Sequence, residues 1–263
     1  MDALVGERRI SYDARGLAEP TADVPHVSEV SGETAVFDAA GLTTRQINLE
    51  LRSLLYEQGV KDVTVKNPGS KHSIGVGILT RCKITYEGSL GYFGCGLIDG
   101  PEVHITGRVG WSACENMMSG VVVIESNAGS LTGAALRGGD IVVKGRVGAR
   151  SGIDQKGGTI ITLGSAGSMT GFMMQRGRQI ICGDAGPGLG DSMYDGIIYV
   201  GGKVKALGID CVPGEWTDAD MEYIDRKFGI YDLGSPPEFQ KFVCGKKLYN
   251  YDNLEPSERK LVL

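Results

Sequence analysis

The side chains that could do chemistry in this chain are few and widely spaced. It has six cysteines and three histidines, with no C-x-x-C spacing and no paired histidines close to a cysteine. Zinc and iron–sulfur sites require such closely spaced ligands, so we expect no metal site here. The cysteines are Cys82, Cys95, Cys114, Cys182, Cys211 and Cys244.

The carboxylates and glycine-rich runs also do not form a recognisable active site. The acids Glu125, Asp140, Asp154 and Asp184 are scattered, whereas glycoside hydrolysis needs two carboxylates facing one bond. The run 186–190 is similar to a nucleotide-binding loop, but it lacks the preceding strand and following helix. The chain has no G-x-S-x-G, H-E-x-x-H or Walker motif. We therefore predict no catalytic, cofactor-binding or metal-binding residue in this chain.

The elements that must position these residues repeat every 19 residues. Short apolar runs begin at Ile84, Val103, Val122, Ile141, Ile160, Gln179 and Ile198. Glycine or another small residue recurs at fixed offsets within each unit, which is typical of a solenoid. Apolar residues at the first and third positions predict a short strand with one buried face. His104 occupies the second position of its unit, so we expect it to face solvent.

Stacked strands of this kind predict a mainly β fold, a single-stranded parallel β-helix of about seven coils. The usual hand of crossover connections favours a right-handed coil. Glycine pairs such as Gly138-Gly139 are expected to turn the chain in left-handed conformations, and Gly148 and Gly167 are expected to form similar corners. Cys95 and Cys114 share one offset and should stack, where cysteine serves as a small buried residue more readily than as half of a disulfide.

Helices are expected at both ends of the coil, to cap its open strands. The first should run from Thr44 to Gln58, capped by Thr43 or Thr44 and stopped by Gly59. The second should run from about residue 217 to 228, followed by a short helix or turn at 239–243. This pattern divides the chain into an N-terminal segment with its capping helix (1–64), the β-helix (65–210, with Val65 taken as 19 residues before Ile84) and a C-terminal cap and tail (211–263). The tail could pack on a coil face or on another chain.

The composition is that of an ordinary globular protein. The net charge of −5 argues against non-specific binding to nucleic acid or to an anionic membrane, which requires a basic face. No window of eighteen apolar residues predicts a membrane span, and the first nine residues do not read as a secretory signal. We therefore expect a cytoplasmic protein.

The glycine spacing between Gly107 and Gly208 resembles that of a known family. Together with Gly41-Leu42-Thr43-Thr44-Arg45 and Lys247-Leu248-Tyr249-Asn250, it resembles the GXGXG domain of glutamate synthase, a right-handed β-helix at the C-terminus of the large subunit. The arrangement is also similar to the separate β-helix subunit of N-methylglutamate synthase. The resemblance covers about residues 36–250.

This resemblance implies a non-catalytic scaffold subunit of a glutamate-synthase-like complex. A glutaminase-type (class II amidotransferase) subunit and an FMN-binding synthase subunit would be its partners, and FMN and an iron–sulfur cluster would reside in those partners. The chain begins Met1-Asp2 and lacks an N-terminal cysteine for the glutaminase reaction, so no family catalytic residue is carried over. The chain could also associate with copies of itself. A β-helix subunit of a formylmethanofuran-dehydrogenase-type complex and a free-standing carbohydrate-active enzyme stay as alternatives.

Overall fold

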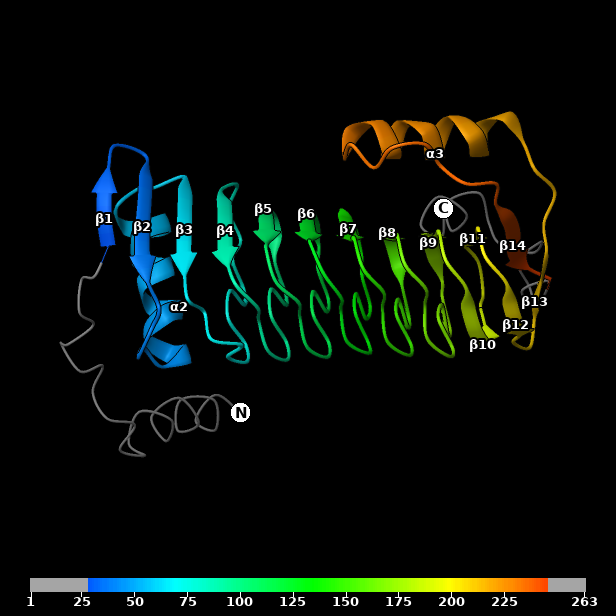
Figure 1. Cartoon of the computed structure of the whole chain (residues 1–263), viewed down its shortest axis with the longest axis horizontal. Helices are drawn as coiled ribbons and strands as arrows, with labels where there is room; N and C mark the ends of the chain where they lie inside the picture. Colours follow the sequence, from blue (N-terminus) through cyan, green and yellow to red (C-terminus); the bar gives the residue numbers. More distant parts are fainter. Residues whose placement is uncertain (1–27, 246–263) are drawn as a thin grey trace, which may run out of the picture.

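The computed structural model describes residues 28–245. It is mainly β, with 34% strand and 12% helix, and forms a parallel β-solenoid of about 8 turns, which confirms the predicted fold class. Figure 1 shows the coils stacked side by side along one long axis. The tail 246–263, which the sequence analysis expected to pack on a coil or on another chain, lies outside the described residues.

One twelve-stranded sheet runs the length of the rod, in the order β1-β2-β3-β4-β5-β6-β7-β8-β9-β11-β14-β13. Its strands are β1 (Ser28–Ser31), β2 (Thr34–Asp38), β3 (Asp62–Lys66), β4 (Lys83–Glu87), β5 (Asp99–Ile105), β6 (Ser119–Ile124), β7 (Asp140–Val143), β8 (Lys156–Thr162), β9 (Arg176–Ile181), β11 (Ile197–Val200), β13 (Cys211–Pro213) and β14 (Gln240–Cys244). A second sheet pairs β10 (Ala185–Leu189) with β12 (Val204–Leu207) in parallel.

The 19-residue period is the register of this sheet. Ile84 pairs with Val103, Val103 with Val122, and the same step continues to Ile198. These residues point into the coil, where Val122, Ile141 and Ile198 are fully buried. A second row of parallel bridges joins Val109, Ala128, Val147, Ala166 and Ala185. Each coil thus buries aliphatic side chains from two extended segments.

The first coils depart from the period. Val63, and not Val65, pairs with Ile84, so this coil has 21 residues and the register predicted from Val65 was wrong. Because Val63 and Val65 both point inward, the alternation of apolar residues fits either register equally well. The parallel ladder also begins earlier than expected, at β2, where Ala35 pairs with Val63.

The predicted N-terminal helix forms the connection between β2 and β3. It comprises α2 (Thr44–Arg52) and a π-helical extension, η1 (Ser53–Glu57), and Thr43 caps it in a capping box with Gln46. The side chain of Asn48 ties the helix to the next coil. Its Nδ2 donates to the Ser73 carbonyl at 2.8 Å and its Oδ1 accepts from the Gly75 amide at 2.8 Å. The helix therefore covers the first coils of the rod, as Figure 1 shows.

The C-terminal helix, α3 (Asp218–Ile230), lies along the outer face of the large sheet (Figure 1). Ile224 and Phe228 pack there with outward-facing residues of β7, β8, β9 and β11, which are Val142, Ile161, Ile180 and Tyr199. The parallel ladder ends at β11, where β14 pairs antiparallel with it, and β13 pairs antiparallel with β14 at the edge of the sheet. The predicted helix or turn at 239–243 was therefore wrong, because this segment completes the backbone hydrogen bonding of β11.

The corner glycines divide into two kinds. Gly139 has φ +82° and Gly158 has φ +66°, as expected for left-handed turns. Gly148 and Gly167 do not have positive φ, so the corner predicted at these two positions was wrong. A Cβ atom on Gly148 would lie 2.5 Å from the Ser130 amide nitrogen of the previous coil. Glycine is needed there because neighbouring coils approach backbone to backbone.

Candidate functional site

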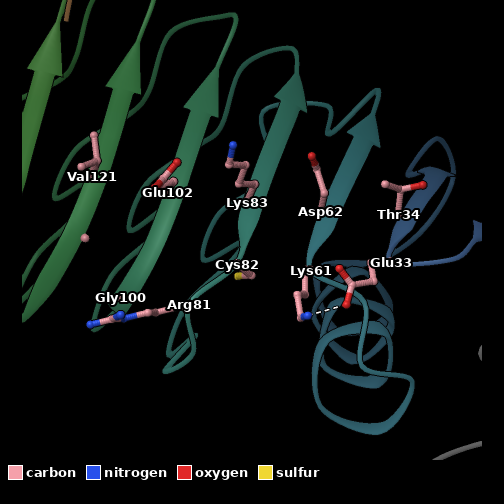
Figure 2. A pocket seen from close by; sticks show the side chains of 11 residues that line it. Glu33, Thr34, Lys61, Asp62, Arg81, Cys82, Lys83, Gly100, Glu102 and Val121 are labelled. Carbon is pink, nitrogen blue, oxygen red and sulfur yellow. Dashed lines mark hydrogen bonds and ion pairs between the residues drawn. The ribbon is translucent and has the colours of Figure 1, made fainter. Parts of the chain in front are cut away.

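A groove of about 620 Å³ lies along the beginnings of strands β2 to β6. Figure 2 shows Asp62, Lys83 and Glu102 on neighbouring strands, with Arg81 and Lys61 nearer the loops that lead into them. The groove is lined by Glu33, Thr34, Lys61, Asp62, Arg81, Cys82, Lys83, Gly100, Glu102, Gly120 and Val121.

The strand register places the groove's charges in an alternating row. Asp62 pairs with Lys83, and Lys83 pairs with Glu102. Each of these residues precedes an inward-facing residue, so each projects from the outer face of the sheet. Lys61 forms an ion pair with Glu33 at one end. With Arg81, the lining holds three acidic and three basic side chains, an arrangement suited to a surface that also carries both signs.

A second groove, of about 440 Å³, adjoins the first along the outer face of the sheet. Both are lined by Lys83, Glu102 and Val121. The second extends to the end of α3, where Ile230 is 61% exposed. We call the outer surface of β3 to β5 the bare face, because α3 and the residues packed with it cover the outer surface of the strands from β6 onward.

His104 lies on the bare face, and its side chain is 45% exposed, as the strand alternation predicted. Its Nε2 is 2.8 Å from Oε1 of Glu125, whose other oxygen is 2.9 Å from the Lys144 ammonium. Burial raises the pKa of the Glu125 carboxyl, but hydrogen bonds from Lys144 and His104 outweigh it and bring the pKa below its usual value. This pairing of His104 with Glu125 was not predicted from the sequence. The spacing could have indicated it. His104 and Glu125 are 21 positions apart, which is one 19-residue coil plus two residues and therefore places them on the same side of neighbouring coils.

The other acids noted in the sequence have separate structural partners. Asp140 accepts hydrogen bonds from Lys227 of α3 and from Tyr231, which directly follows this helix. Asp154 pairs with Lys156 at 2.7 Å, and Asp184 accepts from the Lys203 amide at 2.7 Å. The structure therefore uses these carboxylates at different places to join neighbouring segments, and it does not bring them together.

The cysteines Cys82, Cys95 and Cys114 are buried, and the glycine-rich run 186–190 overlaps a strand. Cys95 and Cys114 are buried thiols at one offset, in left-handed conformations with φ of 56° and 59°. Burial raises the pKa of Cys95 to about 12, which keeps it protonated at neutral pH. Cys82, in the first groove, has its pKa raised to about 11 by burial and by Asp62. The run 186–190 overlaps strand β10, with no helix following it.

Residues 28–245 contain neither a cluster of metal-ligating side chains nor a membrane-spanning helix. In that part of the chain, no three acidic, histidine or cysteine side chains come together as metal ligands would. No helix in the same range has both the length and the apolar character needed to cross a bilayer.

Comparison with known proteins finds a partial similarity. No protein-family model matches the chain. A stretch of 66 residues is 38% identical to Protein GlxC of Rhizobium meliloti (strain 1021). The match covers 24% of this chain and 29% of that protein, so the chain matches less than a third of its relative's length. The relative's name states no activity.

Proposed function

We propose that this chain is a non-catalytic scaffold subunit of a glutamate-synthase-like complex. It would hold a glutaminase-type subunit and an FMN-binding synthase subunit in register for the formation of glutamate or N-methylglutamate. The 19-residue glycine repeat and its resemblance to the GXGXG domain support this proposal. The partial similarity to Protein GlxC is compatible with it and adds no activity of its own.

The bare face is the observation that carries the proposal. On β7, β8, β9 and β11, one outward row is apolar and packs with α3, namely Val142, Ile161, Ile180 and Tyr199. On β3 to β5 the corresponding rows are polar or charged, and two adjoining grooves cross them. Each of β3 to β5 is paired with a strand on both sides, so the backbone positions that carry the charges have a fixed spacing. Fixed charges of both signs favour a specific partner and the right docking register more than they favour raw affinity.

In this proposal, the reactive groups belong to the partner subunits. The glutaminase subunit would release ammonia, and the synthase subunit would hold the FMN and the iron–sulfur cluster. This chain would contribute relative placement, which matters because a small reactive product is best passed between sites whose separation is constant.

The test is co-purification. The full chain, tagged and expressed at its native level, is expected to recover both a class II glutaminase-type protein and an FMN protein. Lys83→Glu, which reverses one charge in the middle of the groove row, is expected to lower that recovery about tenfold, because like charges would face each other across the interface. Lys205→Glu makes the same change on exposed strand β12 and should leave recovery unchanged.

Recovery of neither partner by the unmodified chain would overturn the proposal. Recovery of a molybdenum or tungsten protein instead would point to the formylmethanofuran-dehydrogenase alternative. Equal losses in the two lysine variants would remove the bare face from the docking surface.

A further inference from the structure

Two cysteines face each other at the C-terminal end of the rod. Cys211 of β13 is directly opposite Cys244 of β14 in their antiparallel pairing. The amide of Gly245 donates to the Asp210 carbonyl, and the amide of Gly214 donates to the Lys241 carbonyl. These two bonds make 210/245 and 214/241 hydrogen-bonded pairs of the antiparallel ladder. Hydrogen-bonded and non-hydrogen-bonded pairs alternate along such a ladder, so the pair Cys211–Cys244, next to 210/245, is a non-hydrogen-bonded pair.

This register brings the two backbones within the range of a disulfide. Opposite residues of a non-hydrogen-bonded pair have Cα atoms about 4.5 Å apart, and disulfides span Cα distances of about 4.4–6.8 Å. Side chains at opposite positions also project from the same face of the sheet. The positions therefore meet the geometric requirement with little backbone movement.

The sulfur atoms converge on the turn before β11. Cys244 Sγ donates a hydrogen bond to the Met193 carbonyl at 3.1 Å. Cys211 lies beside the same turn, since a Cβ on Gly190 would be 2.7 Å from its Sγ and 3.0 Å from Sδ of Met193. Burial raises the pKa of Cys211 to about 11, and the charge of Cys244 acts in the same direction. Both residues are thiols in this structure.

We propose that Cys211 and Cys244 form a reversible disulfide that joins the last two strands of the sheet. With hydrogen peroxide as the oxidant, the half-buried Cys244 thiolate attacks one peroxide oxygen and becomes a sulfenic acid, and hydroxide leaves. The sulfur of Cys211 then displaces the hydroxyl group from Cys244 as water. In sum, two thiols and one peroxide give one disulfide and two waters. Two thiols of a reductant such as glutathione reverse the step.

Access distinguishes this pair from the stacked cysteines in the coil. Cys95 and Cys114 are exposed by 1% and 0%, so an oxidant cannot reach either of them without unfolding. Cys244 is only half buried, and a reagent can reach it in the folded chain. The disulfide would close a loop that contains the whole of α3, since residues 218–230 lie between the two cysteines. Oxidation would therefore hold both flanks of this helix to the rod.

The experiment uses the full chain, purified with reductant and then treated with one equivalent of hydrogen peroxide. Alkylation followed by peptide mapping is expected to show Cys211 linked to Cys244, while Cys95 and Cys114 stay reduced. The melting temperature should rise by roughly 5–15 °C and return to its starting value with dithiothreitol, because a cross-link restricts the unfolded chain.

Two variants make the result specific. Cys244→Ser should abolish both the linked peptide and the rise in melting temperature. Cys182→Ser changes another half-buried cysteine and should preserve both. The proposal is overturned if oxidation leaves both thiols open to alkylation or links either one to a different cysteine. It is also overturned if the melting temperature of Cys244→Ser rises as much as that of the unmodified chain.

Discussion

At the scale of single residues, the close approach of stacked backbones is the strictest requirement. Gly148 is one of a column of glycines at which a Cβ would collide with the preceding coil. Its Cβ would lie 2.5 Å from the Ser130 nitrogen and 2.8 Å from the Gly129 carbonyl carbon. Backbone atoms cannot rotate away as the end of a flexible side chain can. Even one methyl group should therefore force two coils apart.

Gly148→Ala is expected to lower the free energy of unfolding by about 1–3 kcal/mol, the usual range for overpacking. Gly229→Ala is the matched control, because nothing lies within 4 Å of that position and it belongs to α3. Alanine there should leave stability unchanged or raise it by about 0.5–1 kcal/mol. Urea unfolding of both variants measures the difference, and equal stabilities would show that the coils tolerate a side chain at Gly148.

The sequence revealed where glycine was required but not always why. For Gly139, the left-handed turn was a local property, and the prediction was confirmed. For Gly148, the reason is a contact with a residue of another coil, which no local rule contains. Conversely, Cys95 and Cys114 take left-handed φ at an offset that later coils fill with glycine. Stacking in the rod holds them there despite the local cost.

At the scale of elements, α3 is held to the sheet by a buried polar cluster as well as by apolar packing. Asp220 accepts hydrogen bonds from Tyr199 of β11 at 2.6 Å and from Lys241 of β14 at 2.7 Å. Burial raises the pKa of the Asp220 carboxyl, but the hydrogen bonds from Lys241, Tyr199 and Thr217 outweigh it and bring the pKa to about 2. The charged form of Asp220 thus stabilises the junction of three elements.

This shift makes the docking of α3 sensitive to acid. The pKa of Asp220 is about 2 in the folded chain, against 3.8 for an ordinary aspartate, so its contribution is complete above about pH 4. It is lost as the pH falls from about 4 to 2. Asp220→Asn should therefore destabilise the chain at pH 7, and the difference from the unmodified chain should shrink towards pH 2. Thermal unfolding across this range measures it, and a difference that stays constant with pH would contradict the assignment.

The sequence predicted the extent of α3 better than its position. Its start at Asp218 follows from the local capping signal at Thr217, while its end at Ile230 lies two residues beyond the predicted end at Phe228. Its place on the outer face depends on where one outward-facing row of residues, one from each strand, changes from polar to apolar. That row is polar at Thr64, Thr85 and His104, then apolar from Val123 through Tyr199. The change is visible in the sequence once the register is known, but the inward-facing residues, which define the period, carry no trace of it.

At the scale of the whole molecule, the constant 19-residue period was sufficient to predict the fold, but it did not predict the grooves. The 19-residue step predicted the pairing of β4 through β9 and β11 without error. The first groove lies where the step is irregular. It is beside the 21-residue coil between β3 and β4 and beside the coil between β2 and β3, which contains α2. Its lining comes from residues just before the strands and from outward-facing residues at the beginnings of the strands. Such positions have no fixed residue type, so nothing in the period marks them.

The same period predicts that one coil can be removed. Deleting 104–122 joins Val103 to Val123 in phase, and this variant should fold into a rod shorter by about 4.8 Å. Deleting 105–122 removes one residue fewer and should fail to fold cooperatively, because it turns inward side chains of that strand outward. Circular dichroism and thermal unfolding compare the two. Similar cooperative melting of both would mean that register does not select the fold.

The two outermost strands of the sheet have a consequence for solubility. β1 and β13 are four and three residues long, and each runs antiparallel to its neighbour. A rod of parallel coils with exposed ends could add further rods without limit, as in a fibre. Here, within residues 28–245, each end of the large sheet offers an incoming molecule only three or four residues of backbone. End-to-end polymerisation is therefore disfavoured, and the stack keeps a finite length.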